Sequence, residues 1–524
     1  MASAGKSISI FHASLGENVR LAREAGDVAG EEYWSSLVGE VDEMIWQAVR
    51  AGFDYFQREA GFTRTGSHNG RVHGRETGQW HEADLVVALW LQHTSRDGDM
   101  QLHVHSQIAH TARTVTDGKW RAPDSLGYNE HLGAVAAIVS QHLEEALTAR
   151  FGLAWEARDD GHGFEIKGIP GEMMGLFSSR RQSITADLRD RAARFEAQYG
   201  RAPSQRELAR LAQASNFKTR GAKHGALDFT QLHSGWADTL GVSLASVAPS
   251  VWHGGGGHAA ARTRGPEDPG PVLSPLAVYR AAQKAVALAQ QDKSTWTRAD
   301  VIKYLGRVLP RSGMDSAAAA ALLEDLADRA LASEFEPVAC LEAPEPVRVP
   351  DSLLRADGRS VYRRHGGVRF ATHAQLTMEQ RMLALARATG APRMTRAQAG
   401  HAFGADLAQL EAALAGYAQD APSVRTRTGL REDQAAAALA VLTDGRRVSV
   451  INAPAGAGKT WVLAAAGRAW AAAGLGRVIG ITPSQSARNT LAAAVSTQVL
   501  PDPAGALITE TRRPSVSTDR AAAA

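Results

Sequence analysis

Two apolar runs joined by a short turn constrain the fold of this chain more than any other feature of its 524 residues. The first run, Leu85 to Leu91, precedes the turn-forming triplet Asp97-Gly98-Asp99, and the second run contains His103 and His105. This order predicts two adjacent antiparallel strands. Because residues i and i+2 of a strand point to the same face, the two histidines are expected to lie together. His93, at the end of the first strand, would bring a third imidazole to the same point.

These histidines suggest a metal site. Imidazole is the commonest side-chain metal ligand, and three protein ligands with an open position suit a catalytic cation. The alternative for a bare His-x-His pair is two histidines that face solvent or are hydrogen-bonded in a core. The surrounding residues favour the metal site, because Gln92 to His105 resembles the histidine-triad motif of the TrwC/TraI-type (MobF) conjugative relaxases.

Five further stretches resemble the same family, in the same order along the chain: Gly5 to Ser9, Ala60 to Arg64, Asp117 to Arg121, Ser178 to Arg181 and Thr219 to Lys223. The resemblance implies an α+β relaxase-type domain in which helices cover an antiparallel sheet. Relaxases of this family nick one strand of plasmid DNA and stay attached to its 5′ end through a tyrosine. The implied partners are single-stranded DNA at an origin of transfer and other conjugation proteins. The implied cofactor is a divalent metal, Mg²⁺ or Mn²⁺, with Zn²⁺ as the alternative.

The third metal ligand departs from the family pattern. The family's first histidine usually stands eleven residues before the second, and that position here is Gln92. His93 is one residue closer, so on a regular strand it would point to the opposite face. A β-bulge could turn it back. The predicted ligand set is His93, His103 and His105, and the choice between Gln92 and His93 stays open.

Charge adds a candidate DNA-binding surface. The net charge is only +3, from 58 basic and 55 acidic residues, so the chain is not basic throughout. Between Arg180 and Lys223, however, eleven Lys or Arg residues accompany four Asp or Glu residues. Such a stretch can neutralise phosphates, and we expect Arg180, Arg181, Arg220 and Lys223 to contact DNA. The alternative is a solvated helical face.

Composition and periodicity divide the chain into segments 1–240, 241–272, 273–425, 426–510 and 511–524, of which 241–272 reads as a Gly/Pro-rich linker and 511–524 as a disordered tail. The resemblance to relaxase-helicases implies a relaxase-type domain over 1–240, a helical, winged-helix-like accessory region over 273–425, and the N-terminal part of a superfamily 1 helicase RecA-like domain over 426–510. Within them the patterns predict a strand over 7–11, helices over 31–59 and 127–151, a capped helix start within 294–303 and a hairpin over 361–370.

A phosphate-binding loop follows the buried-strand pattern Val448 to Ile451. The loop reads Ala453-Pro454-Ala455-Gly456-Ala457-Gly458-Lys459-Thr460, and an alanine-rich helix comes next. Strand, glycine loop and helix in this order are the context of a Walker A motif in an α/β P-loop domain. Backbone N–H groups around Gly456 and Gly458 can hold phosphate oxygens. Lys459 would reach the β- and γ-phosphates, and the Thr460 hydroxyl would bind Mg²⁺.

The residues just before this strand resemble the adenine-contacting motif of superfamily 1 helicases, with Gln434 as the contact. The resemblance therefore implies ATP with Mg²⁺ as a second cofactor. A strand-turn-helix that binds no nucleotide is the alternative.

Two parts of the family pattern are not found. No tyrosine or aspartate precedes Lys6 and Ser7, where the family's nucleophile and general base would stand, and no acidic Walker B segment follows Lys459. We therefore expect a fragment truncated at both ends, a pseudogene fragment or a misassigned reading frame. It would be a DNA-binding remnant, inactive alone, with no catalytic residue assigned. The alternative is an active metal-dependent relaxase that uses an unrecognised tyrosine, Tyr33 or Tyr128.

The cellular compartment is suggested by what the sequence lacks. No apolar run is long enough for a transmembrane helix, and the N-terminus has no signal-peptide pattern. One cysteine, Cys340, excludes an intrachain disulfide framework. We expect a cytoplasmic protein that is not inserted into a membrane.

Overall fold

The computed structural model describes residues 2–66, 71–72, 75–76, 78–219, 228–240, 242–252, 273–345, 347–404, 410, 426, 428–454, 456–476 and 478. The chain forms two compact units. The first comprises residues 1–182 and 220–377, and the second comprises residues 183–219 and 378–524.

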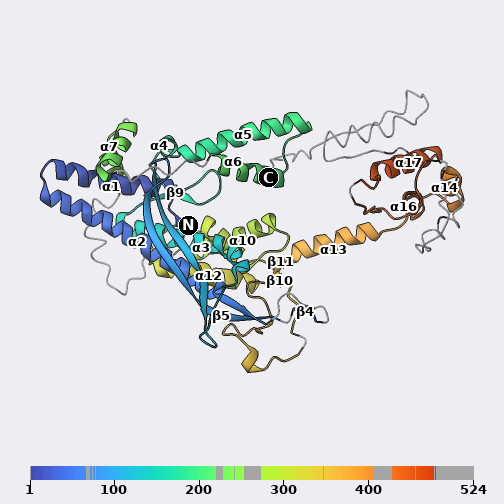
Figure 1. The fold of residues 1–524 in the computed structure, drawn as a ribbon, viewed down its shortest axis with the longest axis horizontal. Helices are drawn as coiled ribbons and strands as arrows, with labels where there is room; N and C mark the ends of the chain where they lie inside the picture. Colours follow the sequence, from blue (N-terminus) through green and yellow to red (C-terminus); the bar gives the residue numbers. More distant parts are fainter. Residues whose placement is uncertain are drawn as a thin grey trace, which may run out of the picture. The chain divides into compact units, whose positions relative to one another are not determined.

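A five-stranded antiparallel sheet organises the first unit. Its strands run in the order β1 (Ala2–Ser3), β6 (Met100–Thr114), β5 (Gln79–Thr94) and β2 (Phe62–Thr65), and β7 (Trp120–Arg121) also pairs with β6. The long strands β5 and β6 are the predicted histidine hairpin, which is confirmed (Figure 1). Their turn closes at Gly98, whose φ of +81° is a conformation that glycine adopts without strain.

Three long helices pack with this sheet: α1 (Lys6–Glu24), α2 (Val28–Ala60) and α3 (Tyr128–Phe151). The helices predicted over 31–59 and 127–151 are therefore confirmed. The strand predicted over 7–11 is wrong, because these residues open α1. Ile8, Phe11 and Leu15 are fully buried at helical spacing, and Leu102 and Val104 of β6 belong to the same core.

Shorter elements complete this core. They are α4 (Gly171–Leu176), α7 (Phe229–Leu240), α8 (Val247–Val251), the 3₁₀ turn η2 (Leu244–Ser246) and the hairpin of β8 (Trp155–Ala157) with β9 (Phe164–Ile166). Leu244, Val247 and Val251 are buried, so the start of the segment predicted as linker over 241–272 is folded core. Residues 253–272 lie outside the described part of the chain.

A second core joins α3 to the region predicted as a separate accessory unit. Its helices are α10 (Pro275–Asp292), α11 (Arg298–Val308) and α12 (Ser316–Leu331), and Tyr55, Ala134 and Ile138 pack among them. The predicted helix start is confirmed, since Thr297 and Asp300 form a capping box.

The hairpin predicted over 361–370 is wrong. β11 (Phe370–Thr372) pairs instead with β10 (Val338–Cys340), and residues 361–369 form turns and irregular chain. The remaining elements of this unit are the strand pair β3 (Arg71–Val72) and β4 (Arg75–Glu76) and the 3₁₀ turns η1 (Ser125–Gly127) and η4 (Asp351–Leu353).

The second unit is helical where it is described. It holds α6 (Gln205–Lys218), α14 (Arg396–Phe403), α16 (Glu432–Thr443) and α17 (Lys459–Ala472), together with most of α5 (Ser179–Tyr199) and α13 (His373–Arg387), which begin in the first unit. Residues 448–451, predicted as a buried strand, are irregular, and Val450 is 83% exposed. No strand pairs with them among the described residues. None of the helices described in either unit is both long and apolar enough to cross a bilayer.

Candidate metal centre and nucleotide loop

His103 and His105 converge on one face of β6. Their Nε2 atoms lie 3.2 Å apart, and their rings meet edge to face with centroids 4.9 Å apart. His103 Nδ1 lies 2.9 Å from the carbonyl oxygen of Gln101, which can only accept a hydrogen bond. Nδ1 therefore carries the proton, and in the neutral ring Nε2 keeps its lone pair for a ligand.

Gln92 joins this pair from the neighbouring strand. It stands directly opposite His103 in the β5–β6 register, and its Oε1 lies 3.0 Å from His105 Nε2. Trp90, which stands opposite His105, stacks on that imidazole at 5.5 Å. Directly opposed residues of an antiparallel pair share a face. The Gln92 amide oxygen is thus the third candidate metal-ligand atom on this face of the hairpin.

His93 lies elsewhere. The β5–β6 register shifts between Gln92 and Thr94: two residues of β6, Gln101 and Leu102, stand opposite His93, so the bulge is in β6. Its ring stacks on His12 of α1 at 5.1 Å, and its Nε2 lies 3.6 Å from Oδ1 of Asp42 on α2. The bulge does not turn His93 towards the histidine pair. It leaves the side chain on the face that the helices cover.

The donor set of Gln92, His103 and His105 fits a divalent cation. Zinc–nitrogen bonds of about 2.1 Å in tetrahedral geometry place ligand atoms about 3.3 Å apart, close to the 3.2 and 3.0 Å observed. His103 is buried, His105 half-buried and Gln92 exposed, so the site opens to solvent on one side. An amide oxygen is a harder ligand than imidazole, so the set is less selective for zinc than three histidines are.

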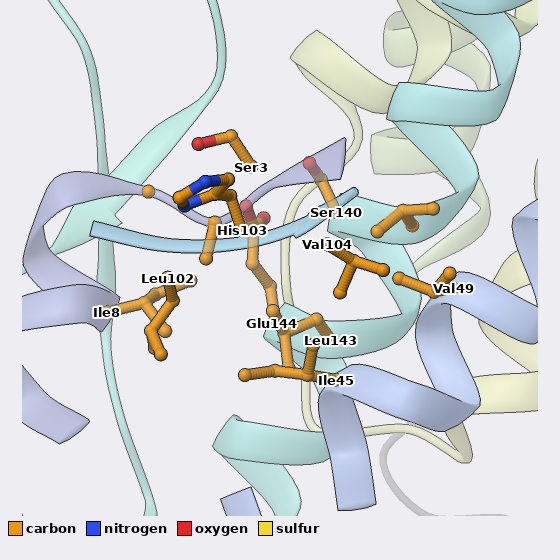
Figure 2. Close-up of a pocket in the computed structure, with 13 residues that line it drawn as sticks. Ser3, Ile8, Ile45, Val49, Leu102, His103, Val104, Ser140, Leu143 and Glu144 are labelled. Carbon is orange, nitrogen blue, oxygen red and sulfur yellow. The ribbon is translucent and has the colours of Figure 1, made fainter. Parts of the chain in front are cut away.

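A small, mostly apolar pocket borders His103 on its inner side. Figure 2 shows the His103 ring beside Ser3, and Leu102 beside Ile8. The pocket's carboxylate, Glu144, is held by Arg311, whose Nε lies 2.6 Å from Oε2. The residues that line the pocket include side chains from β6, α2 and α3, which pack the strand that carries the histidines against these two helices.

The basic segment begins at the turn of the same hairpin. Ser179, the first residue of α5, donates from its backbone N to Asp99 Oδ2 at 3.0 Å and from its hydroxyl to Oδ1 at 2.8 Å. Lys6 Nζ joins the start of β6 to the residues just before α5, because it donates to the carbonyls of Met100 and Phe177 at 2.7 and 2.6 Å. These anchors hold the start of α5 beside the hairpin.

Two of the four predicted DNA-contacting residues, Arg180 and Arg181, lie in the described part of the chain. Arg181 is exposed and pairs with Asp160 at 3.1 Å, and Arg180 is half-buried. Arg220 and Lys223 lie outside the described residues. Further along, the predicted capping box of Ser204 and Glu207 opens α6.

The glycine loop of the second unit has two glycines in the left-handed backbone region. Gly456 and Gly458 have φ of +79° and +81°, and Gly458 caps the N-terminus of α17. Lys459 Nζ donates to the carbonyls of Ala453 and Pro454 at 2.7 and 2.8 Å, so the ammonium group closes the loop.

Gln434 reaches this loop from α16, and its side-chain nitrogen donates to the carbonyl of Ala457 at 2.9 Å. Gly458 has a φ of +81°, and this conformation, rather than the nearby tip of the flexible Gln434 side chain, favours glycine at the position. Thr460, the second residue of α17, is half-buried. The structure thus brings the predicted nucleotide residues to one loop.

The two tyrosines considered as substitute nucleophiles are involved in packing. Tyr128 packs on Phe56 at 5.0 Å, and burial, with a smaller contribution from Asp124, raises its pKa to about 12. Tyr33 packs edge to face on Trp34 at 5.2 Å. The environment of Tyr128 therefore disfavours a tyrosinate nucleophile.

Sequence reasoning did not single out His12 or Asp42. His12 directly follows the segment misread as a strand, and Asp42 is a polar residue on a long helix without a motif around it. The spacing of His12, Asp42 and His93 along the chain has no recognisable pattern.

Comparisons with known proteins bear on both units. Residues 35–242 match the TrwC relaxase family model, and residues 429–500 match an AAA domain. No curated protein matches the chain. Among solved structures, copper-bound and metal-bound forms of conjugative relaxase TrwC with oriT DNA are each 23% identical. They cover 46% of this chain and 70% and 71% of their own, with a TM-score of 0.34. TrwC complexed with a 27-mer DNA comprising the recognition hairpin and the cleavage site is also 23% identical. It covers 46% of this chain and 73% of its own, with a TM-score of 0.32. These structural likenesses are distant and assign no role to any residue here.

Proposed function

Because the chain belongs to the TrwC relaxase family through residues 35–242 and carries an AAA domain at residues 429–500, we propose that it binds single-stranded DNA at a divalent-metal site. The DNA would be an origin of transfer, and other conjugation proteins would be its partners. The observation that supports this most is the convergence of three donor atoms on the open face of the β5–β6 hairpin.

In this proposal Gln92, His103 and His105 hold the cation, in place of the expected set that included His93. A bound divalent cation would polarise a phosphate oxygen of the DNA. The Gln101 carbonyl fixes the His103 ring through Nδ1. Trp90 holds the His105 ring by stacking on it. His105 binds through Nε2 once its ring proton resides on Nδ1. Mg²⁺ or Mn²⁺ suits the mixed oxygen and nitrogen set, and Zn²⁺ is the alternative.

DNA contact falls to Arg180 and Arg181, with Arg220 and Lys223 as further contacts. Asp99 stands four residues before His103 on β6, about 13 Å at ~3.3 Å per residue. Ser179 is hydrogen-bonded to Asp99, and Arg180 and Arg181 follow it in the first turn of α5. The two arginines therefore lie at a similar distance from His103. A strand of DNA held there by its phosphates would extend to the metal site.

We further propose that the chain forms no covalent adduct with DNA. Tyr128 packs on Phe56, and burial raises the pKa of its hydroxyl to about 12, which disfavours the tyrosinate that would attack a phosphate. The loop of Gly456, Gly458, Lys459 and Thr460, with Gln434, would bind ATP with Mg²⁺ in the cytoplasm.

The test is binding of a fluorescent single-stranded oligonucleotide, measured by anisotropy with Mn²⁺ and with chelator. We expect tighter binding with Mn²⁺, and we expect the difference to vanish in a His103→Ala, His105→Ala double variant. A matched His110→Ala variant changes an exposed histidine farther along the same strand and should behave as the parent. If the double variant keeps the full Mn²⁺ effect, the site does not bind the metal that assists DNA binding.

A further inference from the structure

A second cluster of metal-binding side chains lies on the opposite face of β5. It consists of His12 from α1, Asp42 from α2 and His93 from β5, and each offers a ligand atom within 4.8 Å of the other two. His12 Nε2 lies 3.0 Å from Asp42 Oδ1, and His93 Nε2 lies 3.6 Å from the same oxygen. Three elements far apart in sequence thus direct two imidazoles and a carboxylate at one point.

The distances suit a coordinated cation. Ligand atoms around a tetrahedral Zn²⁺ lie about 3.3 Å apart, which is midway between the two distances to Asp42 Oδ1. The burial is graded, with His12 at 9% side-chain exposure, Asp42 at 29% and His93 at 47%. The cluster is therefore enclosed by protein on the His12 side and open at His93, where a cation and its remaining water could enter.

Both imidazoles are aimed at one oxygen of the same carboxylate, while their rings stack at 5.1 Å. Neutral imidazoles and a carboxylate are all ordinary ligands of a divalent cation, so one cation can be shared by the three groups.

We propose that His12, Asp42 and His93 form a second cation site, for a borderline divalent metal of the Zn²⁺, Co²⁺ or Ni²⁺ class. Two imidazoles and one carboxylate suit such metals. The site is structural, because it joins α1 and α2 to the end of β5. His93 stands opposite the bulge of β6 and directly after Gln92 on β5. A cation that holds His93 therefore fixes the backbone that presents Gln92 on the other face.

The experiment counts bound Zn²⁺ by equilibrium dialysis and elemental analysis, in buffer free of nucleotide. The reference protein carries His103→Ala and His105→Ala, so that the site on the open face is absent. We expect this protein to bind one equivalent of Zn²⁺. Adding His93→Ala or Asp42→Asn should remove that equivalent, whereas adding His110→Ala should leave it. Co²⁺ should give visible absorption in the reference protein that both added variants abolish.

The two proposals fail separately in this design. If the open face binds no metal, the parent and the double variant bind equal amounts of Zn²⁺, and the loss on adding His93→Ala is unaffected. If Zn²⁺ remains at one equivalent after both His93→Ala and Asp42→Asn, the second site does not exist. His93 is largely exposed, so its truncation should not unfold the protein. Metal-free thermal unfolding of each variant, followed by circular dichroism, checks this.

Discussion

Replacing Gln92 with histidine should convert the site on the open face into a three-imidazole site. Gln92 stands opposite His103, and its Oε1 is already 3.0 Å from His105 Nε2. An imidazole at this position would therefore be presented to the same point. Four-ligand structural zinc sites contribute roughly 10–16 kcal/mol, or about 3 kcal/mol per ligand. Because the amide already supplies part of this, we expect a gain of about 1.4–3 kcal/mol, which is about tenfold to a hundredfold in Zn²⁺ affinity.

The assay is calorimetric titration of Zn²⁺ and of Mg²⁺, in an Asp42→Asn background that removes the cation proposed on the other face. Zn²⁺ affinity should rise and Mg²⁺ affinity should not, because imidazole favours the softer metal. A Gln213→His variant adds an exposed histidine on α6 as the matched control. If Gln92→His binds Zn²⁺ no more tightly than that control, Gln92 does not face the metal and the donor set is misassigned.

Four further predictions concern other parts of the structure: the basic segment, the tyrosines, the glycine loop and Asp124. Arg181→Ala should lower the slope of log K against log salt for single-stranded DNA by roughly 0.7, the value for one lost phosphate contact; an unchanged slope would remove Arg181 from the interface. Incubation with Mn²⁺ and an origin-of-transfer oligonucleotide should give no covalent adduct on denaturing electrophoresis, and an adduct mapped to any tyrosine would contradict the proposal. Lys459→Ala should weaken binding of a fluorescent ATP analogue by about tenfold or more, since a charge-assisted hydrogen bond is lost; equal binding would exclude the loop. Burial alone would raise the pKa of Asp124, but hydrogen bonds from His365 and Trp80 outweigh it and lower that pKa to about 2. Its stabilising contribution should thus be present at neutral pH and be lost as the pH falls from about 4 to about 2. Denaturant unfolding of Asp124→Asn should differ from the parent at pH 7 and converge with it near pH 2.

Local patterns predicted the histidine hairpin because they contain its whole cause. The turn at Gly98, the two apolar runs and the alternation of side chains all lie within about twenty residues of one another. The long helix over Val28–Ala60 was equally predictable, since its buried positions repeat at helical spacing over many turns. The glycine loop was predicted for the same reason, because its backbone conformations require Gly456 and Gly458.

The errors concern segments whose structure is decided by distant partners. Residues 7–11 alternate in polarity over a few positions, which a strand and the first turns of a buried helix both satisfy. Here the continuation to Leu15 decides for the helix. Residues 361–370 contain only the first residue of β11, and the partner of that strand, Val338–Cys340, lies some thirty residues away. The pattern over 448–451 predicted burial, but burial of a strand depends on neighbours that a four-residue run does not specify.

The position of His93 shows how a one-residue difference in spacing acquires meaning. A strand directs adjacent residues to opposite faces, so Gln92 and His93 cannot both serve the histidine pair unless the bulge reverses one of them. The register shift between Gln92 and Thr94 instead leaves His93 with His12 and Asp42. The glutamine at position 92 and the histidine at position 93 therefore have separate consequences. The first weakens the open-face site, and the second supplies the exposed ligand of the other. Because Gln92 and His93 are joined by one peptide bond, a metal ion bound to either side chain also restricts the backbone that presents the other side chain.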